Sequence, residues 1–92
     1  MTQHASPFNP STTISYHLSA VSYITLKIFN SLGQEIAALT NNEIQSSGEH
    51  KIEFNAEKYN LSSGVYFLAM NAACINSQTN QYHNVVKMIY LK

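Results

Sequence analysis

The sequence predicts an all-β protein, an antiparallel sandwich of six to seven short strands. Apolar residues alternate with polar ones through most of the chain, which is the period of a half-buried strand. No segment longer than a few residues has apolar side chains at the helical spacing, and the alanine pair in "EIAALT" is too short to form a helix alone. Turn signals separate the alternating runs, as is typical of sandwiches.

The first half of the chain contains two strands and a hairpin partner. "TTISYHLS", residues 12–19, and "SYITLKIF", residues 22–29, each place three apolar side chains on one face. "NSLG" is a turn signal in which Gly33 supplies the positive φ. "QEIAALT", residues 34–40, is expected to pair back on its predecessor as a hairpin.

The middle of the chain is expected to hold a loop, a strand and a connection. "NNEIQSSG", residues 41–48, reads as a polar loop that ends in a glycine. "EHKIEFN", residues 49–55, alternates again and predicts a strand. In the connection "AEKYNLSSG" we expect Leu61 to fill part of the core.

The last third holds two near-continuous apolar runs, "VYFLAMNA" and "NVVKMIYLK", which predict strands covered on both faces. Between them "ACINSQTNQYH" predicts a polar hairpin tip. Pro7 and Pro10 precede the first strand, where a proline removes no hydrogen bond from a sheet. We therefore expect residues 1–10 to be a linker or entry segment and residues 11–92 to be the β-sandwich.

Composition excludes several classes of partner. Charged residues make up 11% of the chain, against roughly 25% in ordinary soluble domains, and the formal net charge is zero. The absence of arginine and of a basic patch argues against binding to nucleic acid or to an anionic membrane surface. No apolar run approaches the roughly 18 residues of a membrane-spanning helix, so no membrane insertion is expected.

The reactive side chains do not form a catalytic or metal-binding motif. Cys74 has no partner for an internal disulfide and is interpreted as a small, half-buried apolar residue. His17 and His50 could approach each other across a sheet, but satisfied or solvent-facing histidines are the expectation. The chain has no metal-binding histidine spacing, no phosphate loop and no nucleophile elbow. The histidines considered as metal ligands are His4, His17, His50 and His83. We expect no enzyme activity, no catalytic residue, no cofactor and no metal.

Tyr66 is the only residue with a polar tip in the apolar run that follows "LSSG". In immunoglobulin-like sandwiches the hydroxyl of a tyrosine near a strand start forms a hydrogen bond with the backbone a few residues upstream. This arrangement, the tyrosine corner, lies two residues before a core position. Leu68 occupies that core position here, and Gly64 suits a tight approach or a positive φ at the corner. Tyr66 is therefore expected to fasten the fold.

Five stretches in order resemble one family. The chain is similar to the C-terminal sorting domain, type A, of proteins that Bacteroidetes-like bacteria export by the type IX secretion system. The resemblance covers nearly the whole chain from Ser6 to Lys92. The stretches that carry it are "SPFNPSTTISYHL", "ITLKIFNSLGQEIAAL", "GEHKIEFNA", "LSSGVYFLAM" and "KMIYLK".

The resemblance implies an immunoglobulin-like sandwich at the C-terminus of a larger secreted protein, passing through the periplasm to the outer-membrane surface or the medium. It implies an N-terminally attached cargo, recognition by the secretion translocon and a sortase-like protease that removes the domain. Matching structural positions are Pro7, Phe8, Asn9 and Pro10 in the entry motif and Gly64, Val65 and Tyr66 in the internal motif. The residues matching the terminal motif, expected to be recognised by partners, are Lys87, Met88, Ile89, Tyr90, Leu91 and Lys92.

The chain departs from the family pattern at three places. The connection between the last two strands, residues 71–84, is longer than usual and has no glycine. Ser6 stands where asparagine is common. Tyr90 stands where leucine is common, which bears on the facing of the terminal strand.

The two ends of the chain carry further expectations. The N-terminus has no signal-peptide pattern and reads as a piece of a longer protein given a start methionine, with residues 1–6 on the linker side. Nothing follows Lys92 to cover the last strand, so its edge is expected to be open to partner strands. The same edge makes a homodimer an open alternative.

Two other functions remain open at this point. A carbohydrate-binding or adhesive spacer module of a secreted hydrolase would need an aromatic platform, and the exposed candidates Phe29, Tyr59 and Tyr82 are scattered. A structural domain like the immunoglobulin-like part of flagellar hook-capping proteins would share the fold.

Overall fold

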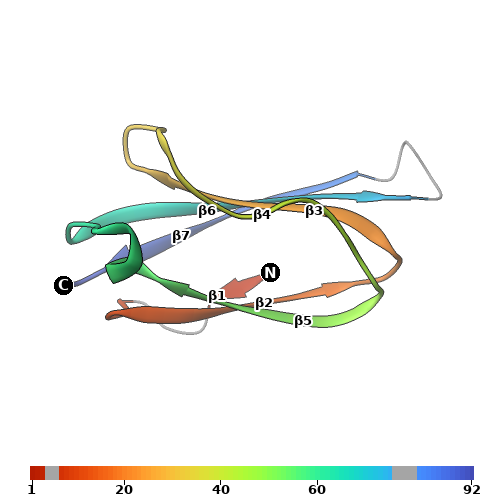
Figure 1. Cartoon of the computed structure of the whole chain (residues 1–92), viewed down its shortest axis with the longest axis horizontal. Helices are drawn as coiled ribbons and strands as arrows, with labels where there is room; N and C mark the ends of the chain where they lie inside the picture. The colour runs from red at the N-terminus through yellow and green to blue at the C-terminus, as the bar shows by residue number, and fades with distance from the viewer. Residues whose placement is uncertain (4–6, 76–80) are drawn as a thin grey trace.

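The computed structural model describes residues 1–3, 7–75 and 81–92, and it confirms the predicted all-β sandwich. Two antiparallel sheets face each other (Figure 1). One sheet has the order β1-β2-β5, and the other β4-β3-β6-β7. The strands are β1 (Thr2–Gln3), β2 (Ser11–Leu18), β3 (Ser22–Asn30), β4 (Glu35–Gln45), β5 (Gly48–Asn55), β6 (Gly64–Cys74) and β7 (Gln81–Tyr90), and a 3-10 turn, η1 (Ala56–Tyr59), follows β5.

The core lies between the sheets and follows the predicted alternation. In β3 the inward side chains of Ile24, Leu26 and Ile28 have no exposed surface. Leu61 is buried as expected, although it follows a 3-10 turn that the sequence did not predict. The largest fully buried side chains are Tyr90, Phe54, Ile14, Ile24, Leu26, Ile28, Leu68, Met70 and Met88. Burying such apolar surface is the main source of stability in a domain of this size.

The β3–β4 hairpin forms where the turn signal lies. Gly33 has a φ of +83°, which glycine adopts without steric cost. The Asn30 side chain organises the turn, because its Oδ1 accepts hydrogen bonds from the N–H groups of Leu32 and Gln34, each at 3.0 Å. Leu32 at the tip is 82% exposed.

The loop expected at residues 41–48 is wrong for most of its length, because β4 continues to Gln45. Tyr23 pairs with Ile44, and Ser22 pairs with Gln45. The ladder shifts register on the way, and Asn42 in that region has a φ of +50° and donates its N–H to Thr25 Oγ1 at 3.0 Å. Residues 41–45 are largely exposed on both faces of the sheet, so this part of β4 has no apolar alternation that would reveal it in the sequence.

The β6–β7 hairpin is also more regular than expected. Asn71 pairs with His83 and Ala73 with Gln81, so residues at both ends of the expected polar tip continue the ladder. Strand pairing here is set by backbone hydrogen bonds, which polar side chains do not prevent. The tip itself falls largely on residues 76–80, which lie outside the described residues.

The expectation that β6 and β7 are covered on both faces is wrong. Their inward side chains are buried, but on the outer face Val85 is 49% exposed and Phe67 is half-buried. The second sheet covers only one face of the four-stranded sheet (Figure 1). The apolar outer residues therefore form a surface.

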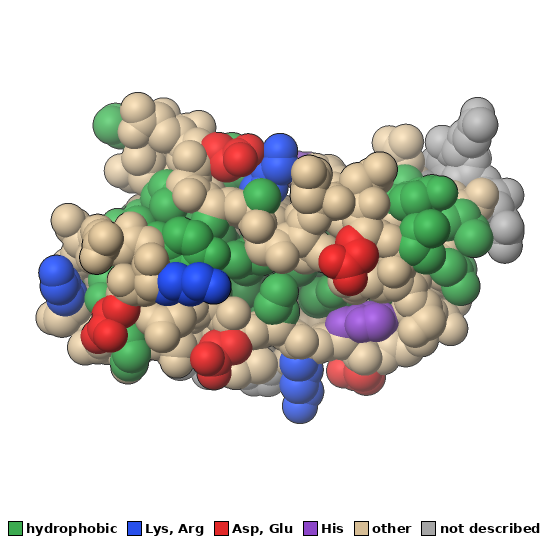
Figure 2. Space-filling model, viewed as in Figure 1, with side chains coloured by type: hydrophobic (Ala, Val, Ile, Leu, Met, Phe, Trp, Pro, Cys, Tyr) green, Lys and Arg blue, Asp and Glu red, His purple; other side chains and the backbone are tan. Residues whose placement is uncertain are grey.

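The N-terminal segment takes part in the fold. Thr2 and Gln3 pair with β2 opposite Ser15 and Ile14, and Phe8 is only 3% exposed. The division at residue 10 remains a prediction. Charged side chains are scattered over the face shown in Figure 2, where neither blue nor red forms a continuous patch. Among the described residues no helix is long and apolar enough to cross a membrane.

Candidate recognition surface

The terminal strand separates its residues into an inner and an outer set. Met88 and Tyr90 have no exposed surface and belong to the core. Lys87 and Lys92 are exposed, Leu91 is 52% exposed and Ile89 is half-buried. Because successive side chains of a strand point to opposite faces, only alternate residues of the motif are available to a partner within β7, and Leu91 and Lys92 follow the end of the strand.

The edge of β7 is covered at its C-terminal end, which corrects the expectation that nothing covers it. Phe8 forms a parallel bridge to Tyr90. The Phe8 N–H donates to the Ile89 carbonyl at 3.0 Å, and the Leu91 N–H donates to the Phe8 carbonyl at 3.2 Å. The entry motif therefore occupies part of the edge that belongs to the terminal motif.

An aromatic cluster fixes the entry motif in the core. The ring centroids of Phe8 and Tyr90 are 5.3 Å apart, and those of Phe8 and Phe54 are 6.1 Å apart in an edge-to-face arrangement. The Pro10 carbonyl accepts the Ala56 N–H at 2.9 Å. The buried Tyr90 hydroxyl has no hydrogen-bond partner among the described residues.

Tyr66 makes the bond predicted for it. Its hydroxyl donates to the Ser62 carbonyl at 2.6 Å while the ring is 7% exposed. A Cβ on Gly64 would meet no heavy atom within 4 Å, so close approach does not explain the glycine, whose φ is +158°. Ser63 Oγ accepts the Lys92 N–H at 2.7 Å, which ties the chain end to the same corner.

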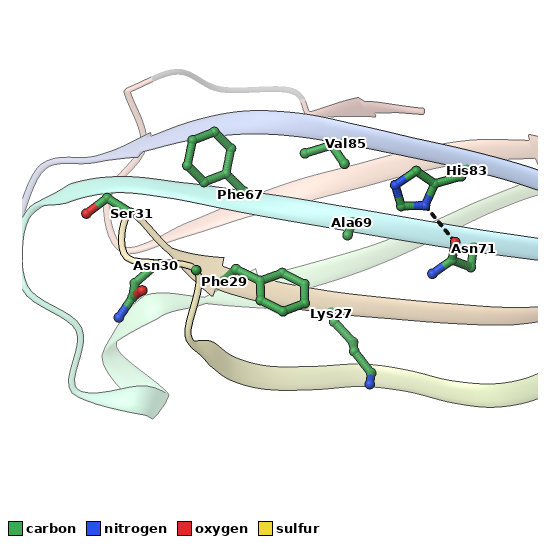
Figure 3. Close-up of a pocket in the computed structure, with 10 residues that line it drawn as sticks. Lys27, Phe29, Asn30, Ser31, Phe67, Ala69, Asn71, His83 and Val85 are labelled. Atoms are coloured by element: carbon green, nitrogen blue, oxygen red, sulfur yellow. Dashed lines mark hydrogen bonds between the residues drawn. The ribbon is translucent and has the colours of Figure 1, made fainter.

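A shallow apolar groove lies on the outer face of the four-stranded sheet. We call it the Ala69 groove, because Ala69 forms its floor between Phe67, Phe29 and Val85 (Figure 3). The cross-strand pairs Phe29–Phe67 and Ala69–Val85 place these side chains together. The methyl group of Ala69 is too small to fill the space between its neighbours, which leaves a volume of about 380 Å³ open to solvent.

Polar groups border the groove. At one end His83 Nδ1 lies 2.6 Å from Asn71 Oδ1, the bond drawn in Figure 3. Lys27 lies on the side of β4, where its Nζ is 3.1 Å from Glu35 Oε1. This pair is partly exposed and contributes little to stability.

The histidines do not converge. His50 lies opposite Tyr16, and their rings stack at 5.3 Å, whereas His17 lies opposite Glu49 and points to the other face. The prediction that His17 and His50 could approach each other across a sheet is therefore wrong. His4 lies outside the described residues, among which no group of three or more metal-ligating side chains occurs.

Tyr16 is buried between the two sheets, with 5% of its surface exposed. Burial raises the pKa of its phenol, and the negative charge of Glu43 raises it further. Its hydroxyl donates to Gln45 Oε1 across the two sheets. Cys74 is half-buried and unpaired.

The aromatic candidates for a glycan platform are separate from one another. Tyr59 is half-buried and stacks on Phe54 with centroids 5.7 Å apart. Tyr82 is 49% exposed, and Phe29 lies in the Ala69 groove on the outer face. No observation favours the carbohydrate-binding alternative.

Sequence reasoning missed the groove and the Phe8 bridge. Phe67 and Val85 were assigned to strands covered on both faces, so their exposure was not expected. The signal that could have found the groove is the small Ala69 on the same face as two phenylalanines. The bridge between Phe8 and Tyr90 joins opposite ends of the chain, and no local pattern predicts it.

Comparison with known proteins gives one match. Residues 6–88 match the family described as the secretion system C-terminal sorting domain. Searches of curated proteins and of solved structures each found no match. The matched range includes the entry motif, the Tyr66 corner and most of β7. The chain therefore belongs to the family of C-terminal sorting domains of the type IX secretion system.

Proposed function

We propose that this chain is a non-catalytic sorting signal, joined on its N-terminal side to a cargo protein that it directs across the outer membrane. Its family membership supports export through the type IX system to the outer-membrane surface or the medium. In the proposed route the cargo passes through the periplasm, the translocon recognises the folded domain, and a sortase-like protease removes it. The linker to the cargo lies within residues 1–10.

The observation that best supports this proposal is the two-sided terminal strand. Met88 and Tyr90 anchor the strand in the core, while Lys87, Leu91 and Lys92 face solvent near the Tyr66 corner. We assign partner contact to the exposed residues and to half-buried Ile89. We assign positioning to Met88 and Tyr90. A low overall charge makes two exposed lysines a distinctive feature for a partner to recognise.

The test is a reporter exported to the periplasm and fused in front of this chain in a type IX-competent bacterium. We expect the unchanged fusion to reach the cell surface and the double variant Lys87→Ala, Lys92→Ala to accumulate in the periplasm. Deleting residues 87–92 is a poor test, because it removes Met88 and Tyr90 from the core. Absence of the unchanged fusion from the surface contradicts the proposal.

The matched control is the double variant Lys51→Ala, Lys58→Ala. These lysines are also exposed, but they lie on β5 and η1, away from the terminal strand. The control removes the same charge and should be exported normally. Equal loss of export in both double variants would assign the effect to net charge and not to the terminal strand.

A further inference from the structure

Among the residues that the structure describes, one stretch of the β7 edge has backbone groups without hydrogen-bond partners. The β6–β7 ladder is regular from Gln81 to Tyr90, and in an antiparallel ladder the N–H and C=O of a residue point to one side, which alternates along the strand. The Ile89 carbonyl and the Leu91 N–H bond to Phe8, so they face away from β6. The backbone groups of residues 83, 85 and 87 therefore face away too. Strand β1 lies close to β7, but within the described residues no backbone group bonds to these three positions.

The side chains of the same stretch carry an apolar centre. His83, Val85 and Lys87 share the outer face, and Val85 in the middle is 49% exposed. Val85 also forms one wall of the Ala69 groove (Figure 3). Edge strands of soluble proteins are usually protected by charges, prolines or bulges, and here only Lys87 serves in that way. An open edge and an apolar groove thus meet at one residue.

We propose that residues 83–87 of β7 bind an extended segment of a protein partner, which adds a strand to the four-stranded sheet. This inference rests on the proposed sorting function and names the recognition mode and a binding stretch beyond the terminal motif. The partner segment carries a long apolar side chain opposite Val85, which covers it and reaches the Ala69 groove. It carries a carboxylate beside Lys87.

Three observations select this occupant. The adjoining part of the same edge already binds an extended segment, Phe8, through two backbone hydrogen bonds, so the added strand continues an existing interface. A helix has no free backbone groups to offer an edge, whereas an extended segment satisfies both donors and acceptors. Lys87 has no ion-pair partner among the described residues, where the only ion pair joins Lys27 to Glu35.

The test uses Val85→Pro in the reporter fusion. Proline removes the N–H that faces the partner but none that bonds to β6, so the fold tolerates it while strand addition is blocked. Val86→Pro is the matched control for geometry, because the Val86 N–H faces β6 opposite Leu68 and its loss should unfold the domain. Val85→Thr keeps the N–H and removes only apolar contact. Folding of each purified chain is checked by thermal unfolding.

We expect folded Val85→Pro to lower surface export at least tenfold and Val85→Thr to lower it two- to fivefold. Normal export of folded Val85→Pro overturns the inference and leaves the sorting function standing. Absence of the unchanged fusion from the surface overturns the sorting function and this inference with it. If Val85→Pro does not fold, His83→Pro is scored by the same criteria. If neither folds, the inference is overturned, because these N–H groups would then be bonded within the domain.

Discussion

Phe8 and Tyr90, separated by most of the chain, form a parallel bridge in which their ring centroids lie 5.3 Å apart. Two backbone hydrogen bonds flank the rings, one to Ile89 and one from Leu91. The segment nearest the proposed cargo junction is thus part of the same unit as the terminal motif. A partner strand that extended from residues 83–87 to the end of β7 would meet Phe8 and have to displace it.

Replacing Phe8 by alanine tests how much this bridge contributes to the fold. Phe8 is 3% exposed and contacts two other rings, so Phe8→Ala should lower the free energy of unfolding by about 3–5 kcal/mol, the usual cost of deleting a buried aromatic side chain. Urea unfolding measures the change. Leu32→Ala is the control, since an 82% exposed side chain should change stability by less than about 0.5 kcal/mol. A similar loss in both variants would contradict the packing shown for Phe8.

Two tyrosine-to-phenylalanine variants should have opposite effects. The Tyr66 hydroxyl donates to the Ser62 carbonyl, and Tyr66→Phe should destabilise the domain by about 1 kcal/mol. The buried Tyr90 hydroxyl has no partner among the described residues, so Tyr90→Phe removes an unsatisfied group and should be neutral or stabilising by about 1 kcal/mol. Thermal unfolding of the two variants, made in parallel, gives the comparison. Destabilisation by Tyr90→Phe would show that its hydroxyl is bonded.

The β3–β4 hairpin offers a third matched pair. Asn30 Oδ1 accepts two backbone N–H groups within its turn, and Asn30→Ala should cost about 1–2 kcal/mol. Ser31 is exposed in the same turn, so Ser31→Ala should be close to neutral. Chemical denaturation distinguishes the two. Equal, small effects would mean that Gly33 and strand pairing alone hold the hairpin.

Stability should fall in alkali because of Tyr16. Burial holds the pKa of its phenol above the ordinary value of about 10, so the folded state binds the phenolic proton more tightly than the unfolded state does. The resulting stability is fully present below the unfolded pKa and is lost as the pH rises through the folded pKa. Urea midpoints measured from about pH 8 to 11 should therefore decline more steeply for the wild-type chain than for Tyr16→Phe. Parallel profiles would exclude Tyr16 as a cause.

The sequence predicts well which side chains face the core, because burial of one face of a strand requires apolar residues at alternate positions. Ile24, Leu26 and Ile28 share the face assigned to them, and Tyr66 makes the bond that its position at a strand start predicts. The exposure of the outward-facing side chains was harder to predict, because the sequence of a strand does not say whether a second layer covers the outer face of its sheet. The apolar pair "VV" in β7 is as compatible with a strand covered on both faces as with an edge strand that exposes one valine.

Long-range pairing limits prediction of the recognition surface. The open part of the β7 edge depends on where the Phe8 bridge ends, and that contact joins residues 8 and 90. The polar strand ends at residues 41–45 and 81–83 were missed, because backbone pairing continues beyond the core. Polar side chains on such extensions look like loop residues in a sequence.

Amide hydrogen exchange gives a direct test of the β7 edge. The N–H groups of Val85 and Lys87 face away from β6 and should exchange quickly, whereas those of Val86 and Met88 bond within the ladder and should exchange slowly. The Leu91 N–H should also be slow, because it donates to Phe8, and Phe8→Ala should release it while Val86 keeps its protection until global unfolding. The measurement is made by NMR on a dilute sample, with size-exclusion chromatography to establish that the chain is monomeric. Slow exchange of Val85 in the monomer would mean that the edge is covered, and a protection at Val85 that appears only at high concentration would identify a second copy of the chain as a strand partner.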